Sequence, residues 1–211
     1  MAIIEKEGNF YLDGVKTPAG NDVFSPNRNL IKTIQAMQSG YYDATKFGIF
    51  SIYCTYRDFI TNGKFFESQA LLKMTIADPF FGENPGGEDN LDFPIVGVRD
   101  LLEKLFDSLN IPKSYFRTPE PESLYNNHLK PLFLKIPQER MTAFVLINAR
   151  LRAPMSLLLL FLHDMYSIEN FKSNPYQFDS EENAHYFRTV ETVKSWLEVF
   201  QTEIEKTGES K

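Results

Sequence analysis

The chain has 211 residues, enough for one substantial hydrophobic core or two small ones. Hydrophobic residues make up 43% of it and charged residues 24%, a balance that indicates a folded globular protein rather than a disordered one. The formal net charge is −6, and the pI is near 5.2. The chain thus lacks the basic surplus that binding to a phosphate backbone requires, and nucleic acid is not expected as its main partner.

Three features of the sequence bear on the cellular compartment and on membrane insertion. Cys54 is the single cysteine, so no intramolecular disulfide can form, which fits a reducing compartment. Its neighbours supply no base, so we expect a buried structural thiol rather than a nucleophile. The first residues lack the pattern of a signal or transit peptide. The longest apolar run, 157–162, is far shorter than the roughly 20 residues of a membrane span. We expect a cytoplasmic protein, or a mature form in a reducing compartment, with no membrane span.

Residues 1–24 carry turn signals at a spacing that predicts three or four short antiparallel strands. Asp13-Gly14 lies between FYL and VKT and is the dipeptide best suited to the positive φ angles of a tight hairpin turn. Glu7-Gly8-Asn9 offers an earlier reversal, and Gly20-Asn21 offers a later one before DVF. The lead-in to the chain is therefore expected to be a small β-rich segment.

Helices are predicted from residue 25 to residue 77, packed on these strands. Ser25 stands where a helix cap is expected, and Pro26 follows at the first helical position, where a missing N–H costs nothing. Gly40 is expected to end this first helix. The stretch 44–60 is apolar on most sides, which predicts a central buried helix.

The clearest break in the chain is predicted at residues 78–94. Its segment DPFFGENPGGEDN combines proline, glycine and acidic residues, which cannot hold a regular element. We expect a mobile acidic loop and a boundary between two lobes there. Residues 95–211 are predicted to form a helical domain, with an all-round apolar helix at 154–166 and a long last helix from Asp179. The fold class is α+β: a small antiparallel β-rich N-terminal segment and a predominantly α-helical body.

The enzyme candidate is the pair His163-Asp164, which ends the apolar stretch SLLLLFL. It resembles the metal-binding pair of the HD superfamily of metal-dependent phosphohydrolases, and His128 would be the earlier histidine ligand. The alternative is a polar helix end that meets water, and in that case these residues hold no metal. No phosphate-cradling loop, Gly-x-Ser-x-Gly element or Cys-x-x-Cys pair occurs, so no cofactor is expected and catalysis lacks other support.

A second resemblance covers Tyr11–Gln38, YLDGVKTPAGNDVFSPNRNLIKTIQAMQ. The stretch resembles the opening of the assembly chaperones that bind the alpha subunit of F-type ATP synthase. Leu12-Asp13-Gly14 stands where that family has its hairpin, Lys16–Gly20 where it has a basic-threonine-proline segment, and Pro26 where a proline precedes the helix. The resemblance implies a β-rich domain followed by a helical one. It also implies a non-enzymatic function, binding an unassembled protein subunit.

Two residues of the last predicted helix are the candidate partner-binding residues. The family has a late cluster of acidic, glutamine and tryptophan-glycine residues. Of that cluster this sequence has Glu191 and Trp196, without a following glycine. Trp196 is predicted to lie at the margin of the apolar stripe, half-buried. A ring in that place either contacts a partner or folds over the edge of the core, and both interpretations stay open.

Three functions from different classes remain open on the sequence alone. The first is a chaperone that assists assembly of a multisubunit complex. The second is a structural or adaptor protein of a macromolecular assembly, for instance a viral one. The third is an HD-like phosphohydrolase.

Overall fold

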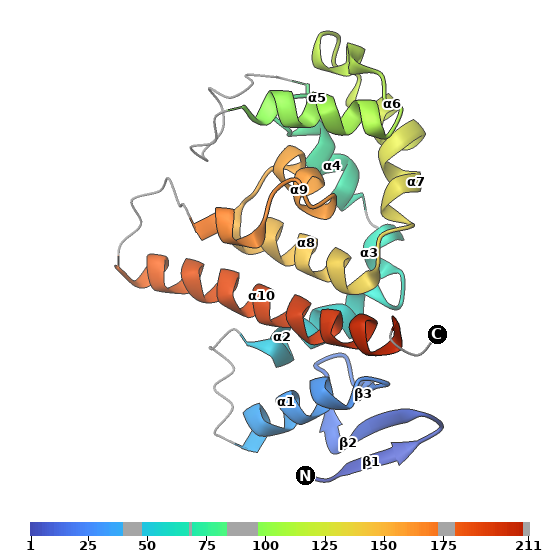
Figure 1. Ribbon diagram of the computed structural model, residues 1–211, viewed down its shortest axis with the longest axis vertical. Coiled ribbons are helices and arrows are strands. Elements are labelled where there is room, and N and C mark those ends of the chain that lie inside the picture. The colour runs from blue at the N-terminus through green and yellow to red at the C-terminus, as the bar shows by residue number, and fades with distance from the viewer. Residues whose placement is uncertain (40–47, 68, 84–96, 173–179, 209–211) are drawn as a thin grey trace.

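The computed structural model describes the chain in five stretches, residues 1–39, 48–67, 69–83, 97–172 and 180–208. An antiparallel three-stranded sheet lies at the N-terminal end, and the rest of the described chain is mostly helical (Figure 1). The predicted α+β class is confirmed.

The sheet is a meander of β1 (Ile3–Lys6), β2 (Asn9–Lys16) and β3 (Asp22–Ser25), in that order. Glu7 and Gly8 connect the first two strands, and both have positive φ angles, 53° and 73°. A two-residue hairpin of this kind requires such angles to match the twist of its strands. The predicted strand count and the earliest of the three reversals are confirmed.

Asp13-Gly14 is not the hairpin turn that we predicted, because it lies inside β2. Gly14 has a φ of 73°, and the β2–β3 pairing is irregular between Tyr11 and Lys16. Positive φ at one residue of a paired strand is typical of a bulge, which bends the strand rather than reversing it. The reversal into β3 comes at Gly20, whose N–H donates to the Thr17 carbonyl at 2.9 Å.

The first helix, α1 (Arg28–Ser39), begins later than predicted. Its cap is Asn27, whose side-chain oxygen accepts a hydrogen bond from the Leu30 N–H at 2.9 Å. Ser25 is the last residue of β3 and accepts from the Asn27 N–H instead, so the prediction of Ser25 as the helix cap is wrong. The predicted stop at Gly40 lies outside the described residues.

The next segments are short helices: α2 (Ile49–Thr55), the π-helical turn η1 (Tyr56–Ile60), α3 (Lys64–Glu67) and α4 (Ala70–Ile76). α2 runs into η1 without a break, and Ile52 and Tyr53 are fully buried. The described part of the predicted central helix, 48–60, is therefore mostly buried, with Phe59 exposed.

The C-terminal part of the chain contains the remaining helical segments, which are α5 (Val98–Ser108), η3 (Lys113–Phe116), α6 (Pro121–Leu124), η4 (Tyr125–Leu129), α7 (Lys130–Phe133), α8 (Gln138–Leu151), α9 (Met155–Leu162), η5 (Ile168–Lys172) and α10 (Ser180–Gly208). Every residue of α9 is buried, as its all-round apolar sequence predicts. It ends before the predicted Tyr166, because Asp164 adopts a left-handed conformation. The predicted start of the last helix at Asp179 lies outside the described residues. Within those residues, no helix is both long and apolar enough to cross a membrane.

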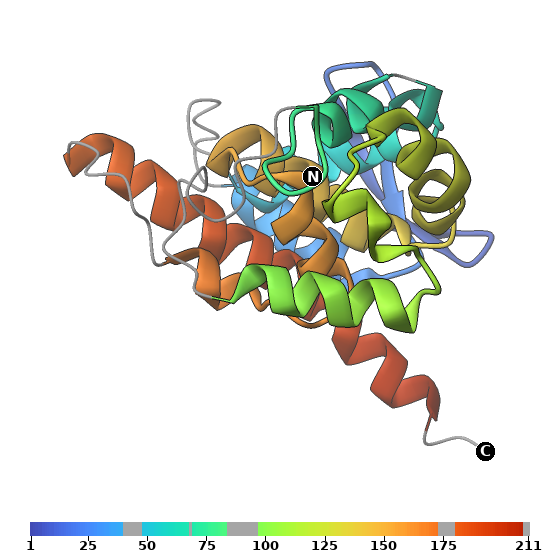
Figure 2. The same cartoon turned by 90° about the horizontal axis from the view of Figure 1, so that it is seen from above.

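α10 crosses the molecule between the N-terminal sheet with α1 and the helices α8 and α9 (Figure 1). Its last turns extend beyond the other elements in the view of Figure 2. Asn27 connects the two sides directly, since its side-chain N–H donates to the Val199 carbonyl of α10 at 3.1 Å. The N-terminal unit is thus fixed to the helical body by α10.

The first residues of the predicted loop at 78–94 form a buried turn. Phe80 and Phe81 are buried in the core. Asp78 is also buried, and its carboxylate accepts from the Phe80 N–H at 2.9 Å and from the Ser156 N–H at the start of α9 at 2.6 Å. Burial raises the pKa of Asp78 to about 6, against these backbone bonds. Residues 84–94 lie outside the described stretches, so a lobe boundary there stays a prediction.

The turn between β2 and β3 is held by one buried carboxylate, that of Asp58 in η1. It accepts hydrogen bonds from the Thr17 hydroxyl at 2.6 Å and from the Asn21 side-chain amide at 2.8 Å. The Ala19 N–H lies at 3.3 Å from its second oxygen. One side chain therefore satisfies three donors of this turn.

Two further residues of the same helical stretch contact β3. The Tyr53 hydroxyl accepts from the Phe24 N–H at 2.9 Å and donates to the Phe24 carbonyl at 2.7 Å. The Arg57 guanidinium lies over the Phe24 ring, 4.3 Å from its centroid. Side chains of α2 and η1 thereby bind the outer edge of the sheet, which no further strand covers among the described residues.

We expect Asp58→Ala to lower the free energy of unfolding by about 3 kcal/mol, because it leaves three donors without their charged acceptor. Urea denaturation measures the effect. The matched control is Asp22→Ala, which removes an exposed carboxylate paired with Lys16 and should cost less than about 0.5 kcal/mol. Equal effects of the two substitutions would contradict the role of Asp58.

A side chain at Gly82 would clash with the backbone of the preceding turn. A Cβ atom there would lie 2.3 Å from the Ile76 carbonyl oxygen and 2.4 Å from that of Asp78, and both are backbone atoms. Gly82→Ala should therefore cost at least about 2 kcal/mol in thermal or urea denaturation. At Gly48 the nearest atom would be 3.9 Å away, so Gly48→Ala should cost less than about 1 kcal/mol. A Gly82→Ala protein as stable as wild type would show that this turn is not packed as described.

Candidate functional site

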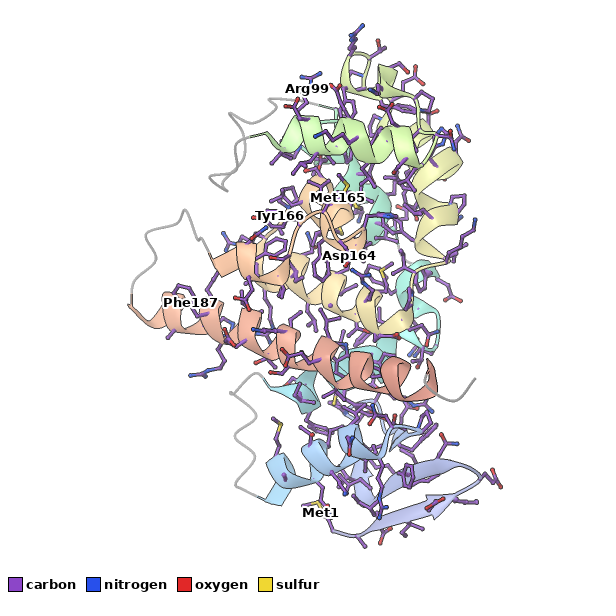
Figure 3. All side chains as sticks on the ribbon, viewed as in Figure 1. Met1, Arg99, Asp164, Met165, Tyr166 and Phe187 are labelled. Carbon is purple, nitrogen blue, oxygen red and sulfur yellow. The ribbon has the colours of Figure 1, made fainter. Side chains whose placement is uncertain are left out.

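A groove of about 400 Å³ opens between the start of α8, the turn that follows α9, and the second half of α10. This volume lies at the lower end of the range for ligand pockets. Its wall is mostly apolar, and the apolar residues are Pro137, Phe161, Tyr166, Ile168, Leu197 and Phe200. Figure 3 marks Asp164, Met165 and Tyr166 in the turn after α9. The groove is thus built from three segments that are remote in sequence.

Two aromatic residues give the groove firm walls. Tyr166 is buried, donates its hydroxyl to the Asn170 carbonyl at 3.2 Å, and packs edge-on against Phe171 at 4.8 Å. Burial also raises the pKa of Tyr166 to about 12, so its hydroxyl stays neutral. On the opposite side the Phe200 ring lies 4.8 Å from the ring of Trp196. Both walls are therefore supported by the core behind them.

Arg140 and Asp164 form the main polar contact of the groove. The guanidinium donates to both carboxylate oxygens, at 2.6 and 3.1 Å, and also to the Phe161 carbonyl at 3.1 Å. These bonds from Arg140 lower the pKa of Asp164. The Asp164 side chain is 79% exposed, so water screens much of the attraction. The pair ties α8 to the end of α9 and neutralises both charges.

His163 follows α9 as its cap and is half-buried. Its Nε2 atom is buried without a hydrogen-bond partner among the described residues. Burial lowers the pKa of His163, and the positive charge of Arg140 lowers it further. The ring is therefore neutral at pH 7.

The three candidate residues of the HD-like metal site, His128, His163 and Asp164, do not come together in the structure. His128 lies in η4, edge-on to Tyr115 at 5.7 Å, and lines a separate pocket of about 270 Å³. Asp164 is bound by Arg140 instead of an ion. Among the residues that the structure describes, no group of three or more His, Cys, Asp or Glu side chains could hold a metal ion.

Trp196 and Glu191, the candidate partner-binding residues, lie in different environments on α10. Trp196 is fully buried and donates its indole N–H to the Glu139 carbonyl at 3.0 Å. The expectation of a half-buried ring at the edge of the stripe is therefore wrong, because α8 covers this face of α10. The buried ring leaves no surface for a partner and instead supports Phe200. Glu191 is exposed and does not line the groove.

Cys54 is poorly suited to nucleophilic chemistry. Burial raises the pKa of its thiol to about 12, and the negative charge of Asp58 adds to the shift. It is partly buried and packs against the core. This agrees with the structural role expected from the sequence.

Sequence reasoning missed the two neighbouring residues that carry most of the polar character of the groove, Glu139 and Arg140. Both fall in the first turns of α8, where charged side chains are ordinary on a solvated helix face. The available signal was Asp164, an acidic residue ending an apolar helix, which implies a basic partner elsewhere in the chain. Nothing in the sequence says which arginine it is.

Comparison of the chain with protein-family models, with curated proteins and with solved structures finds no match.

We expect purified, dialysed protein to carry well under one equivalent of manganese, iron or zinc, because Asp164 already has Arg140 as its partner. Elemental analysis by mass spectrometry measures the content, and His163→Ala should leave it unchanged. Retention of about one equivalent that His163→Ala abolishes would make the phosphohydrolase interpretation the leading one.

Proposed function

We propose that this protein is a non-enzymatic binding protein that holds an unassembled subunit of a larger complex. The observation that carries the proposal is the firm, mostly apolar groove between α8, the turn after α9 and α10. An unassembled subunit exposes a large apolar interface, and a protein that covers it needs an apolar surface of its own. The net charge of −6 would help to keep such a complex soluble.

Binding is favoured over catalysis by the chemistry of the groove. Its arginine and aspartate neutralise each other, and its tyrosine hydroxyl is bonded to a backbone carbonyl. Apart from that ion pair, the groove offers no paired acid and base among the described residues. Such a site can recognise shape, apolar surface and, through the Glu139 carboxylate, positive charge.

The partner is proposed from the resemblance of residues 11–38 to the chaperones of the ATP synthase alpha subunit. In the structure this stretch covers most of β2, all of β3, and α1 except its last residue. Residues at the resembling positions have structural roles there: Gly14 forms the bulge, and Thr17 binds Asp58. A β-rich unit followed by a helical body is also what the resemblance implies. We therefore propose the alpha subunit of an F-type ATP synthase as the partner, bound without nucleotide.

The test is suppression of aggregation. Isolated alpha subunit is diluted from denaturant with and without this protein, and light scattering follows its aggregation. We expect a clear delay at equimolar protein, and no delay for an unrelated aggregating enzyme. Leu12→Asp with Val23→Asp places two charges in the core of the N-terminal unit and should remove the protection.

If well-folded wild-type protein gives no delay at several-fold excess, the chaperone function is wrong. The structural or adaptor function would then be the better interpretation.

A further inference from the structure

The groove has one charged group that no other described residue neutralises, the carboxylate of Glu139. Four ionisable side chains line the groove within the described residues: Glu139, Arg140, Asp164 and Tyr166. Arg140 and Asp164 pair with each other, and Tyr166 donates to a backbone carbonyl. The Glu139 side chain has no hydrogen bond or ion pair within the described chain, and it is half-buried. The groove therefore combines an apolar wall with one uncompensated negative charge.

The position of Glu139 is set by the core rather than by solvent. Its backbone carbonyl accepts the indole N–H of the fully buried Trp196 at 3.0 Å. Trp196 in turn packs on Phe200, which lines the groove. Because the backbone of Glu139 is held in this way, its carboxylate is offered to an incoming ligand from a fixed support. A side chain on a held backbone loses less conformational freedom on pairing than one on a flexible loop.

We propose that the groove binds an amphipathic helical segment of a partner protein, with apolar side chains in the groove and a lysine or arginine paired with Glu139. This inference rests on the proposed function and names the chemistry of the bound segment. A volume of about 400 Å³ accepts one or two large side chains while the backbone of the segment stays outside, as when a helix lies in a groove. Charge complementarity sets the sign of the flanking residue.

The charge also determines what the groove rejects. An acidic segment would place a second negative charge next to Glu139, and like charges across an interface oppose binding. The net charge of −6 acts in the same direction at long range. The groove is therefore selective for basic amphipathic segments over acidic ones of equal apolar content.

The experiment uses two fluorescein-labelled helical peptides and full-length protein. One peptide consists of leucine and lysine in an amphipathic pattern, and its twin has glutamate in place of every lysine. Fluorescence anisotropy at 0.15 M salt measures both affinities. We expect the lysine peptide to bind at least about tenfold more tightly, and Glu139→Gln to weaken it about fivefold. Ile168→Glu, in the apolar wall, should weaken both peptides.

A charge swap separates this site from general attraction to an acidic protein. Glu139→Lys should reverse the preference, so that the glutamate peptide binds more tightly than the lysine peptide. A protein that failed to fold could not show this reversal. The matched control is Glu67→Gln, which removes an exposed carboxylate of α3 outside the groove and should leave both affinities within about twofold. Equal effects of Glu139→Gln and Glu67→Gln would mean non-specific charge attraction and would overturn the proposal.

The two proposals fail in distinguishable ways. If the peptides show the selectivity and its reversal but the alpha subunit still aggregates, the groove chemistry holds and the proposed partner is wrong. If the alpha subunit is protected equally by wild type and by Glu139→Lys, the chaperone function holds and this groove is not its binding site.

Discussion

The packing of the N-terminal sheet on the helical body depends on the hydrogen bonds of one buried carboxylate, that of Asp58. It holds the turn between β2 and β3 through Thr17 and Asn21, 41 and 37 residues earlier in the chain. A carboxylate loses its hydration on burial, and the cost is offset only when its oxygens are well bonded. The turn supplies three donors, so the sheet can pack on η1 only in the register that brings them together.

That constraint extends to the groove through the same helical turn. Tyr56 lies in η1 with Asp58, and its ring is 5.5 Å from Trp196 and 6.3 Å from Phe200. Phe200 forms one wall of the groove, and Trp196 binds the backbone of Glu139. The β-rich lead-in therefore has a structural part in the groove although it contributes no lining residue. This is a physical reason why the shape of the groove depends on the small N-terminal sheet.

Sequence patterns predict correctly the elements whose conformation depends on neighbouring residues. They fail for elements whose conformation depends on contacts with residues far away in the chain. The apolar run 157–162 predicted a helix buried on all sides, because no polar residue interrupts it. Asp13-Gly14 is compatible with either a hairpin turn or a bulge. The chain reverses at Glu7-Gly8, and Gly14 forms a bulge inside β2. The acidic, glycine-rich composition after Asp78 predicted a mobile loop. Its first residue, Asp78, is instead buried and accepts a hydrogen bond from the start of α9, which lies nearly 80 residues further on.

The site was harder to predict than the fold, because its residues share no sequence pattern. By its sequence position Asp164 is an alternative metal ligand, yet the arginine 24 residues earlier pairs with it. An aspartate at the end of an apolar helix attracts a cation of either kind, and sequence alone cannot distinguish a guanidinium from a metal ion. Glu139 differs from its neighbour in one respect, since no described side chain pairs with it. Its carboxylate is therefore available to a basic partner segment, and an ion pair between the two would favour binding.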